Sequence, residues 1–324
     1  MMGEPRKIMT AEELYHVYKS DAEDGNVTAL KGLYFHIYEG EIVTIVGPSG
    51  SGKSTLLKCI GGLMSPSSGK VKFLGKSLHN LPEKEKLILR QQTVSYVFQD
   101  SGLLPHLNII NNVALPLKHW GINPRKARKD AMALLERLGI GDKAKNFPNQ
   151  VSGGEKQRAA IARALITKPR MVLADEPTGS VDPVTSREIH KLFKELNAES
   201  GISFLIVTHS KTTASISHRS MELVDGRFVA QHEDVDVTDL ESSRKILIDE
   251  SGRLSIPQEI LASTGGPGMF ELISNDKNEI KLIRHLSNDK ESELKERLAE
   301  KCIACGYQFT SMDESQCSSC GALR

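Results

Sequence analysis

Short, almost wholly apolar runs recur along the chain, separated by longer segments in which apolar residues have helical spacing. An apolar run of strand length is typical of a parallel strand that is buried on both faces of its sheet. Such runs occupy residues 42–46, 94–98, 171–174 and 204–208. Helical spacing marks residues 108–115, 127–138 and 156–166. The pattern predicts an α/β fold in which a buried sheet carries a helical insert.

The N-terminal part has shorter apolar stretches and more turns. Residues 1–10 are expected to be frayed, and residues 11–18 to form the first ordered segment. Further predicted elements are a loop over 20–26, strands over 27–33, 34–38 and 71–75, and a charged helix over 84–91.

The stretch that follows the first buried run carries the strongest chemical signal. It reads Gly47-Pro48-Ser49-Gly50-Ser51-Gly52-Lys53-Ser54-Thr55 and matches the phosphate-loop pattern G-x-x-x-x-G-K-[ST] between a strand and a helix. Glycines let backbone N–H groups turn inward around phosphates, and the helix N-terminus adds the positive end of its dipole. We expect Lys53 to reach the β- and γ-phosphates of a nucleoside triphosphate, and the Ser54 hydroxyl to bind Mg²⁺. The alternative is a glycine-rich turn that binds nothing. The buried strand before the loop and the helix after it favour the phosphate loop over such a turn.

Polar side chains follow the other buried runs. Gln99 follows 94–98, Asp175 and Glu176 follow 171–174, and His209 follows 204–208. In open α/β sheets, ligands bind at the carboxyl ends of the strands. Asp175 is suited to the shell of Mg²⁺, and Glu176 to a base that polarises the attacking water. The alternatives are a solvated acidic turn and, for His209, an ordinary loop residue.

Two further positions are suited to bind parts of a nucleotide. Ser152 is placed as an N-cap, and Gly153 and Gly154 expose backbone donors at the start of a helix, an arrangement that suits an anion. Tyr18 is a candidate platform for an adenine ring, with a packed strand aromatic as the alternative.

Composition limits the partners of the chain. Its 324 residues leave room for two or three domains, and 39% hydrophobic residues support a sizeable core. The formal net charge of +1 gives no global reason for binding nucleic acid or a membrane surface. The longest apolar runs fall far short of the roughly 20 residues of a membrane span. No apolar core follows Arg6 and Lys7, which argues against a signal peptide, and the five cysteines are expected to be reduced.

Taken together, residues 14–231 resemble the ATP-binding-cassette (ABC) ATPases. The motifs occur in the family order: Tyr18 as the A-loop, 47–55 as Walker A, Gln99 as the Q-loop, 151–155 as the signature, 171–176 as Walker B, 180–182 with Asp182 as the D-loop, and His209 as the switch histidine. Residues 98–100, 103–107 and 173–179 are most similar to the lipoprotein-releasing, macrolide-export and FtsE-like group. Val151 replaces the usual leucine, and Ser180-Val181 replace the usual Ala-Leu. Neither change removes a polar atom that touches phosphate.

The resemblance implies an ATPase that uses ATP and Mg²⁺. The implied catalytic residues are Lys53, Gln99, Glu176 and His209, and the implied Mg²⁺ ligands are Ser54, Gln99 and Asp175. The implied ATP contacts are Tyr18, residues 47–55, Gln99, Ser152, Gly153, Gly154, Asp175 and Asp182. The resemblance also implies a head-to-tail homodimer, in which the signature of one subunit closes over the γ-phosphate bound by the other. Such a dimer would drive an integral membrane permease from the cytoplasmic, inner face of the cell membrane.

The alternative is a soluble ABC ATPase that acts on nucleic acid or ribosomes. Relatives of that kind carry a long coiled coil between Walker A and the signature, or two cassettes in one chain. This sequence has one phosphate loop and no sustained heptad pattern between the two motifs. The sequence therefore favours the transporter interpretation, with residues 11–238 as the cassette.

Residues 244–286 form a predicted second module. Segments 245–249 and 253–257 flank a turn, and segments 269–274 and 279–284 form a second predicted hairpin. Residues 248–257 resemble the AbrB-type swapped-hairpin module, whose members dimerise and often bind DNA. Arg253 is the only notable base in this turn region, which favours dimerisation or partner docking over DNA binding.

Residues 300–324 form a predicted zinc ribbon, after a charged helix or linker over 289–300. Cys302, Cys305, Cys317 and Cys320 occur as two C-x-x-C-G pairs, a spacing that closes a tetrahedral zinc site. About 25 residues cannot bury a stable core unaided, whereas structural zinc supplies on the order of 10–16 kcal/mol. Disulfides are the alternative. Cys59, on the phosphate-loop helix, is expected to pack as an apolar residue.

Overall fold

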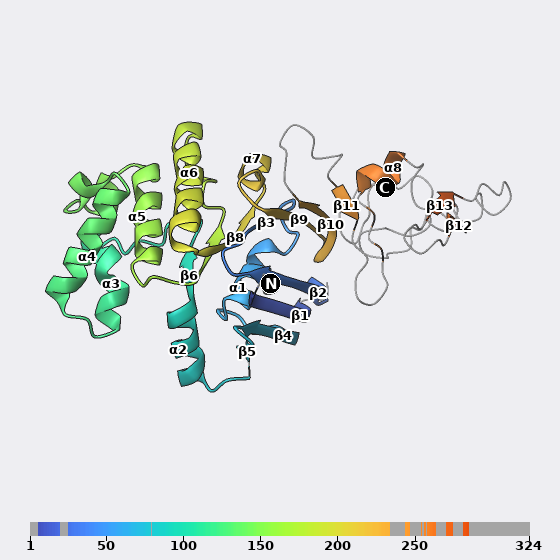
Figure 1. Cartoon of the computed structure of the whole chain (residues 1–324), viewed down its shortest axis with the longest axis horizontal. Helices are drawn as coiled ribbons and strands as arrows, with labels where there is room; N and C mark the ends of the chain where they lie inside the picture. The colour runs from blue at the N-terminus through green and yellow to red at the C-terminus, as the bar shows by residue number, and fades with distance from the viewer. Residues whose placement is uncertain are drawn as a thin grey trace, which may run out of the picture. The chain divides into compact units, whose positions relative to one another are not determined.

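The structure is a computed structural model (Figure 1). It describes residues 6–19, 25–78, 80–233, 244–246, 254, 256, 258–263, 270–274 and 281–284. The predicted zinc ribbon lies outside these residues. The chain divides into two compact units, Met1–Ser255 and Ile256–Arg324.

A seven-stranded sheet forms the centre of the first unit, with strand order β11-β10-β9-β3-β8-β7-β6. The strands β3 (Ile42–Val46), β8 (Ser203–Thr208), β7 (Met171–Asp175) and β6 (Val94–Val97) are parallel neighbours, and they confirm the four apolar runs. Strand β9 (Arg219–Val224) is parallel to β3, whereas β10 (Arg227–Glu233) and β11 (Arg244–Ile246) continue antiparallel.

Side chains from the central strands alternate between two cores, one on each face of the sheet. Ile42, Phe204 and Ile206 belong to the core that includes the helical region. Val43 and Leu205 belong to the core that includes the phosphate-loop helix. Burial on both faces explains why these strands read as continuous apolar runs rather than as alternating ones.

A second, antiparallel sheet has the order β2-β1-β4-β5. Its strands are β1 (Lys7–Tyr18), β2 (Val27–Tyr38), β4 (Ser68–Phe73) and β5 (Lys76–Ser77). The expectation that residues 1–10 are frayed is wrong for the part that begins at Lys7, because Ile8 and Met9 are almost fully buried and pair with neighbouring strands. The two strands expected over 27–38 are one continuous strand.

The helices of the first unit lie around the large sheet and in an insert at one end of it (Figure 1). They are α1 (Lys53–Ile60), α2 (Glu83–Thr93), α3 (Ile109–His119), α4 (Pro124–Arg137), η1 (Gly141–Lys143), η2 (Pro148–Gln150), α5 (Gly153–Leu165), α6 (Pro183–Ser200) and α7 (Lys211–Ala214). Helices α3 and α4 form the predicted helical insert, which packs with α5 at one end of the first unit in Figure 1. Sequence reasoning missed α6 and α7. Among the described helices, none is both long and apolar enough to cross a membrane.

The pieces described beyond residue 240 are short. Strand β11 pairs with β10, whereas the sequence interpretation placed residues 245–249 in a hairpin with 253–257. Residues 247–253 lie outside the described part of the chain. In the second unit, β12 (Phe270–Ser274) and β13 (Lys281–Arg284) form the second predicted hairpin, and α8 (Gln258–Ser263) was not expected. The boundaries of the module stay a prediction.

Candidate nucleotide-binding site

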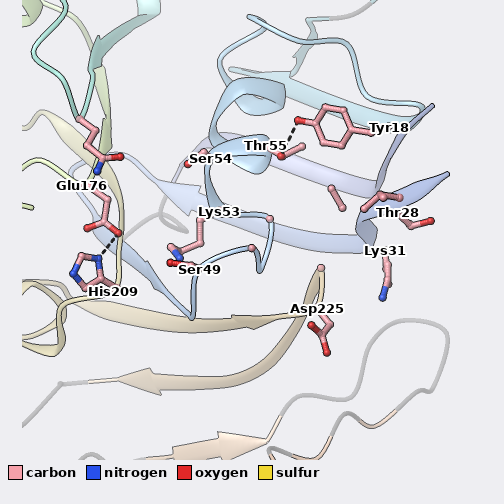
Figure 2. Close-up of a pocket in the computed structure, with 16 residues that line it drawn as sticks. Tyr18, Thr28, Lys31, Ser49, Lys53, Ser54, Thr55, Glu176, His209 and Asp225 are labelled. Atoms are coloured by element: carbon pink, nitrogen blue, oxygen red, sulfur yellow. Dashed lines mark hydrogen bonds and ion pairs between the residues drawn. The ribbon is translucent and has the colours of Figure 1, made fainter. Parts of the chain in front are cut away.

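A pocket of about 610 Å³ lies where the phosphate loop, the sheet edge and the second sheet meet (Figure 2). The residues that line it are Tyr18, Val27, Thr28, Ala29, Lys31, Ser49, Gly50, Gly52, Lys53, Ser54, Thr55, Gln99, Glu176, His209, Asp225 and Gly226. Most of the sequence-predicted site residues are therefore together, although they come from elements far apart in the chain.

The phosphate loop leads directly into α1, whose N-terminus has no side-chain cap. Gly52 has φ 101°, and a Cβ there would lie 2.5 Å from the Ala29 carbonyl oxygen, so the loop requires glycine at this position. The exposed N–H groups of the first turn are thus available to an anion. Ser51 is buried beneath the loop and does not line the pocket.

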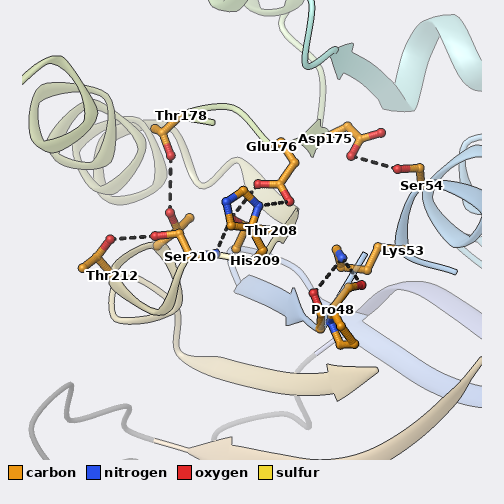
Figure 3. A network of polar contacts seen from close by, with 12 residues as sticks. Pro48, Lys53, Ser54, Asp175, Glu176, Thr178, Thr208, His209, Ser210 and Thr212 are labelled. Carbon is orange, nitrogen blue, oxygen red and sulfur yellow. Dashed lines mark hydrogen bonds and ion pairs between the residues drawn. The ribbon is translucent and has the colours of Figure 1, made fainter. Parts of the chain in front are cut away.

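Lys53 is held inside the loop. Its Nζ donates hydrogen bonds to the carbonyl oxygens of Gly47 (2.7 Å) and Pro48 (2.8 Å), as Figure 3 shows. Burial lowers the pKa of the Lys53 ammonium, whereas the charges of Glu176 and Asp175 act in the opposite direction. The loop therefore positions a desolvated cation that gains from a multiply charged anion beside it.

Ser54 and Asp175 are brought together from α1 and β7. Ser54 Oγ donates to Asp175 Oδ1 at 3.2 Å. Burial raises the pKa of the Asp175 carboxyl, and the Ser54 hydrogen bond opposes this effect. The Ser54 hydroxyl and the Asp175 carboxylate are hard oxygen donors, and Gln99 lines the same pocket as Ser54. Such donors fit Mg²⁺, whose other ligands would be water and phosphate.

Glu176 is fixed on both carboxylate oxygens (Figure 3). Thr208 Oγ1 donates to Oε2 at 2.9 Å, and His209 Nδ1 lies 2.8 Å from Oε1. Glu176 has φ 45°, a left-handed conformation that is uncommon for a residue with a Cβ, and its N–H donates to the Val207 carbonyl. The strained backbone aims a nearly buried carboxylate into the pocket, with the exposed His209 beside it.

Tyr18 ends strand β1 at the far side of the pocket from Glu176 (Figure 2). Its hydroxyl lies 3.0 Å from Thr55 Oγ1, and its ring contacts His16 edge-on, with 4.7 Å between the ring centroids. The side chain is 40% exposed. An exposed and oriented ring of this kind is available to a planar base.

Sequence reasoning missed part of the lining, namely Val27, Thr28, Ala29, Lys31 and the turn Asp225-Gly226. These residues carry no motif. The one usable signal was the Asp-Gly pair between β9 and β10. Both of its residues have positive φ, and a Cβ at Gly226 would lie 2.6 Å from the Ala29 carbonyl oxygen.

The signature and D-loop residues do not line the pocket. Ser152 caps α5, with its Oγ accepting from Glu155 N at 3.3 Å. The Asp182 carboxylate caps α6 by accepting from Val184 N (2.9 Å) and Thr185 N (3.0 Å). The two helix starts lie side by side, since a Cβ on Gly154 would be 2.7 Å from Thr185 Cγ2. Within one chain, the helix start at Ser152 therefore lies outside the pocket of the phosphate loop.

Two other expectations concern cysteine. Cys59 is fully buried in the core, as predicted, and burial raises the pKa of its thiol to about 12. Cys302, Cys305, Cys317 and Cys320 lie outside the described residues, so the zinc site stays a prediction. Within the described residues, no group of three or more His, Cys, Asp or Glu side chains is arranged to hold a metal ion.

Comparisons with known proteins agree with this geometry. A family model described as ABC transporter matches residues 30–179. The lipoprotein-releasing system ATP-binding protein LolD of Bacteroides fragilis is 42% identical over 205 residues, which are 63% of this chain and 95% of that protein. The ABC transporter ATP-binding protein YtrE of Bacillus subtilis is 42% identical over 203 residues, 63% of this chain and 88% of the relative. A solved dimeric ATP-binding cassette in a post-hydrolysis state, bound to ADP and Pi, matches with a TM-score of 0.66 and 36% identity, over 70% of this chain and 99% of that chain.

Proposed function

The chain belongs to the ATP-binding proteins of the ABC transporter family and is an ATPase, and on that premise we propose that it works as a head-to-tail homodimer that drives a separate membrane permease. The observation that carries this proposal is that the groups suited to bind phosphate lie at two separate places in one chain. Lys53, Glu176 and His209 share one pocket, whereas Ser152 and Gly153 lie outside it.

Each pocket residue has a role that its position supports. Lys53 and the loop N–H groups would bind the β- and γ-phosphates, and Tyr18 would stack on adenine. Ser54, Asp175 and Gln99 would hold Mg²⁺, which neutralises charge on the phosphates when bound. Glu176 would accept a proton from the attacking water, while Thr208 and His209 keep its carboxylate in place.

A dimer explains the unused helix start. Gly153 and Gly154 begin α5, where backbone N–H groups point out of the helix, whereas the Ser152 N–H donates to Glu155 Oε2 at 2.8 Å; none of the three lines the nucleotide pocket of the described residues. In a head-to-tail dimer this helix start, with Asp182 beside it, would close over the γ-phosphate held by the other subunit. Two copies of the chain would thus make two composite sites.

Mixing two inactive variants tests the composite sites. Lys53→Ala removes the phosphate-loop cation, and Gly153→Asp places a negative charge at the signature. The aspartate fits the fold, because its Cβ would meet only the Ser180 carbonyl oxygen, at 3.4 Å. Each variant alone should be inactive, but a heterodimer contains one site built from two intact halves. Recovery of ATPase activity on mixing supports the dimer, and a mixture as inactive as its parts contradicts it.

The membrane partner is proposed from the family and from the names of its members. LolD is an ATP-binding protein of a lipoprotein-releasing system, and YtrE is the ATP-binding protein of an ABC transporter. We place this chain likewise on the inner face of the cell membrane, in the cytoplasm, and its net charge of only +1 gives no electrostatic reason for nucleic acid as a partner.

Purification from membranes tests the transporter role. The full chain, isolated from membranes in mild detergent, should bring with it a multi-span membrane protein in fixed ratio. Its recovery only from the soluble fraction, together with DNA or ribosomes, would contradict the proposal and support a soluble ABC ATPase.

For the C-terminal region we propose a zinc ribbon over 300–324 and an AbrB-like module over 244–286 that dimerises or docks to a partner. The cysteine spacing supports the first, and the β12–β13 hairpin is compatible with the second. The purified full chain should contain about one zinc per subunit. The double variant Cys317→Ser and Cys320→Ser should lack it, and a metal-free wild-type chain would contradict the ribbon.

A further inference from the structure

Two segments that carry proposed catalytic residues meet at a second point, outside the nucleotide pocket. The loop after β7 holds Glu176 and continues to Thr178, and the segment after β8 holds His209 and continues into α7 (Figure 3). Their first contact is made by the hydrogen bonds of Thr208 and His209 with the Glu176 carboxylate. Their second contact joins the hydroxyl groups of Thr178 and Thr213, neither of which lines the pocket. The two segments are thus connected twice.

Thr213 is the centre of the second contact. The residue is fully buried, and its Oγ1 lies 3.1 Å from His190 Nε2 and 3.4 Å from Thr178 Oγ1. Its backbone N–H donates to the Ser210 carbonyl oxygen at 3.2 Å, which fixes the residue in the short helix α7. The side chains of His190, Thr213 and Thr178 therefore form one polar chain that runs from α6 through α7 to the loop after β7.

His190 is an exception on the inner face of its helix. Of the four buried residues of α6, a helix that is described in full, Ile189, Phe193 and Leu196 are apolar and His190 alone is polar. A buried polar group costs free energy unless it is hydrogen-bonded, and an apolar side chain at this position would avoid that cost. Burial lowers the pKa of the His190 imidazole, and the charge of Lys194 lowers it further. The ring is therefore neutral at neutral pH and acts as a hydrogen-bonding group rather than as a charge.

Thr178 depends on this polar chain for its position. It lies in a turn that is closed by the hydrogen bond from Gly179 N–H to the Glu176 carbonyl oxygen, at 3.0 Å. Among the described residues, the Thr178 hydroxyl has no hydrogen-bond partner other than Thr213. At 3.4 Å this contact is long for two hydroxyl groups and therefore weak. It persists only if His190 holds Thr213 in place from the other side.

The turn needs such support because its first residue is strained. Glu176 has a φ of 45°, and a non-glycine residue keeps a left-handed conformation only where the surrounding structure enforces it. A displacement of about 1 Å at a catalytic group can cost on the order of 100-fold in rate. A small movement of the turn would therefore affect hydrolysis more strongly than it affects ATP binding.

We propose that His190 is a positioning residue for ATP hydrolysis, which acts through Thr213 on Thr178 and so keeps the Glu176 carboxylate aimed at the attacking water. The inference rests on the proposed role of Glu176 as the base. It adds what holds the turn that begins at this base, from a helix that has no residue in the nucleotide pocket.

Two variants of Thr213 test the proposal, because they remove different parts of one side chain. Thr213→Val keeps the shape and loses the hydroxyl, so kcat should fall at least about tenfold while KM for ATP changes less than about twofold. Thr213→Ser keeps the hydroxyl and loses a methyl group, so its kcat should stay within about twofold of the wild type. If Thr213 only fills space, serine should be the more harmful replacement, because it leaves a cavity.

The outcome that overturns the proposal is a Thr213→Val chain with the wild-type kcat, or a Thr213→Ser chain that loses as much kcat as Thr213→Val. The matched control is Thr212→Val. Thr212 is the exposed neighbour in α7, and its hydroxyl bonds to Ser210 Oγ at 2.7 Å rather than to the polar chain. This control should keep the wild-type kcat.

Variants of His190 test the other end of the polar chain. His190→Leu should lower kcat as Thr213→Val does, whereas His190→Gln, whose amide nitrogen can take the place of Nε2, should recover most of it. The double variant with His190→Leu and Thr213→Val should lose no more kcat than either single variant, because both break the same chain. Losses that multiply would contradict the proposal. If Thr213→Val alone does not fold, the double variant carries the test, since its two apolar side chains face each other.

The outcomes separate the two proposals. If Glu176→Gln hydrolyses ATP at the wild-type rate, the role of Glu176 fails and this inference fails with it. If Glu176→Gln is inactive but Thr213→Val and His190→Leu keep the wild-type kcat, the base stands and only the positioning role of His190 is wrong.

Discussion

Asp175 shows how a residue can be unfavourable for folding and still be required at a site. Burial raises the pKa of its carboxyl, so the carboxylate is penalised in the folded chain relative to the unfolded one. A carboxyl whose pKa is raised by folding destabilises the folded state above that pKa. The effect vanishes as the pH falls below the unfolded value, where the group is protonated in both states.

We therefore expect Asp175→Asn to stabilise the chain in the absence of nucleotide and Mg²⁺. Thermal unfolding should show a higher midpoint at neutral pH, by roughly 2–4 °C for each kcal/mol gained. The gain should shrink toward acidic pH, and Mg²⁺-dependent ATP hydrolysis should be lost. A lower midpoint at neutral pH would show that the carboxylate makes a net favourable contribution to folding.

The predicted site residues that lie close together in the structure share a simple origin. Lys53, Asp175 and His209 each follow a buried parallel strand, and neighbouring parallel strands end at one edge of the sheet. Lys31 and Asp225 were missed because they belong to a second sheet and to a turn, and only the three-dimensional packing brings them to the pocket. The support that Thr208 gives Glu176 was missed for a different reason. A threonine inside a buried strand looks like any other strand residue.

At the scale of elements, Arg163 connects the signature helix to the segment after Gln99. Its guanidinium donates to the carbonyl oxygens of Ser101 (2.6 Å) and Gly102 (2.5 Å). These two consecutive residues have positive φ, of 53° and 55°. Burial lowers the pKa of the Arg163 guanidinium. Helix α5 thus holds a strained turn beside the nucleotide pocket.

We expect Arg163→Met to release this turn. Loss of the two hydrogen bonds should lower the free energy of unfolding by about 1–3 kcal/mol. Because Gln99 would lose its support, KM for Mg²⁺ should rise more than KM for ATP in hydrolysis assays. The conservative variant Arg163→Lys keeps the charge and one donor, so it should recover part of both effects. An equal change in all kinetic constants would indicate a structural role only.

Element types were predicted better than element ends. The amphipathic patterns located α3, α4 and α5, but α3 continues about one turn past its predicted end to His119, although Pro116 cannot donate a hydrogen bond to the Asn112 carbonyl. Helix α6 was missed. Its buried residues Ile189, Phe193 and Leu196 recur at helical spacing, so the sequence did carry a signal for this helix that was not used.

At the scale of the whole molecule, the separation of the signature from the phosphate loop makes association part of catalysis. Glu176→Gln keeps the shape of the side chain and the groups that bind phosphate, but it removes the proposed base. We expect this variant to accumulate as an ATP-bound dimer with hydrolysis reduced by at least about 100-fold. Size measurement with and without ATP checks this. A Glu176→Gln chain that stays monomeric in ATP and hydrolyses at the wild-type rate would contradict both the dimer and the role of Glu176.

The pairing of β11 with β10 bears on where this chain can be shortened. Residues 244–246 supply backbone partners to Ala230, Gln231 and His232, at what would otherwise be the open edge of the large sheet. Cutting the chain at residue 238, the expected end of the cassette, leaves that edge with unpaired N–H and C=O groups. Such an edge is a template for strands of other molecules. The shortened cassette, with the seven-residue β10 as its edge strand, should therefore aggregate more readily in solution than one that ends after residue 246, whose edge strand is the three-residue β11.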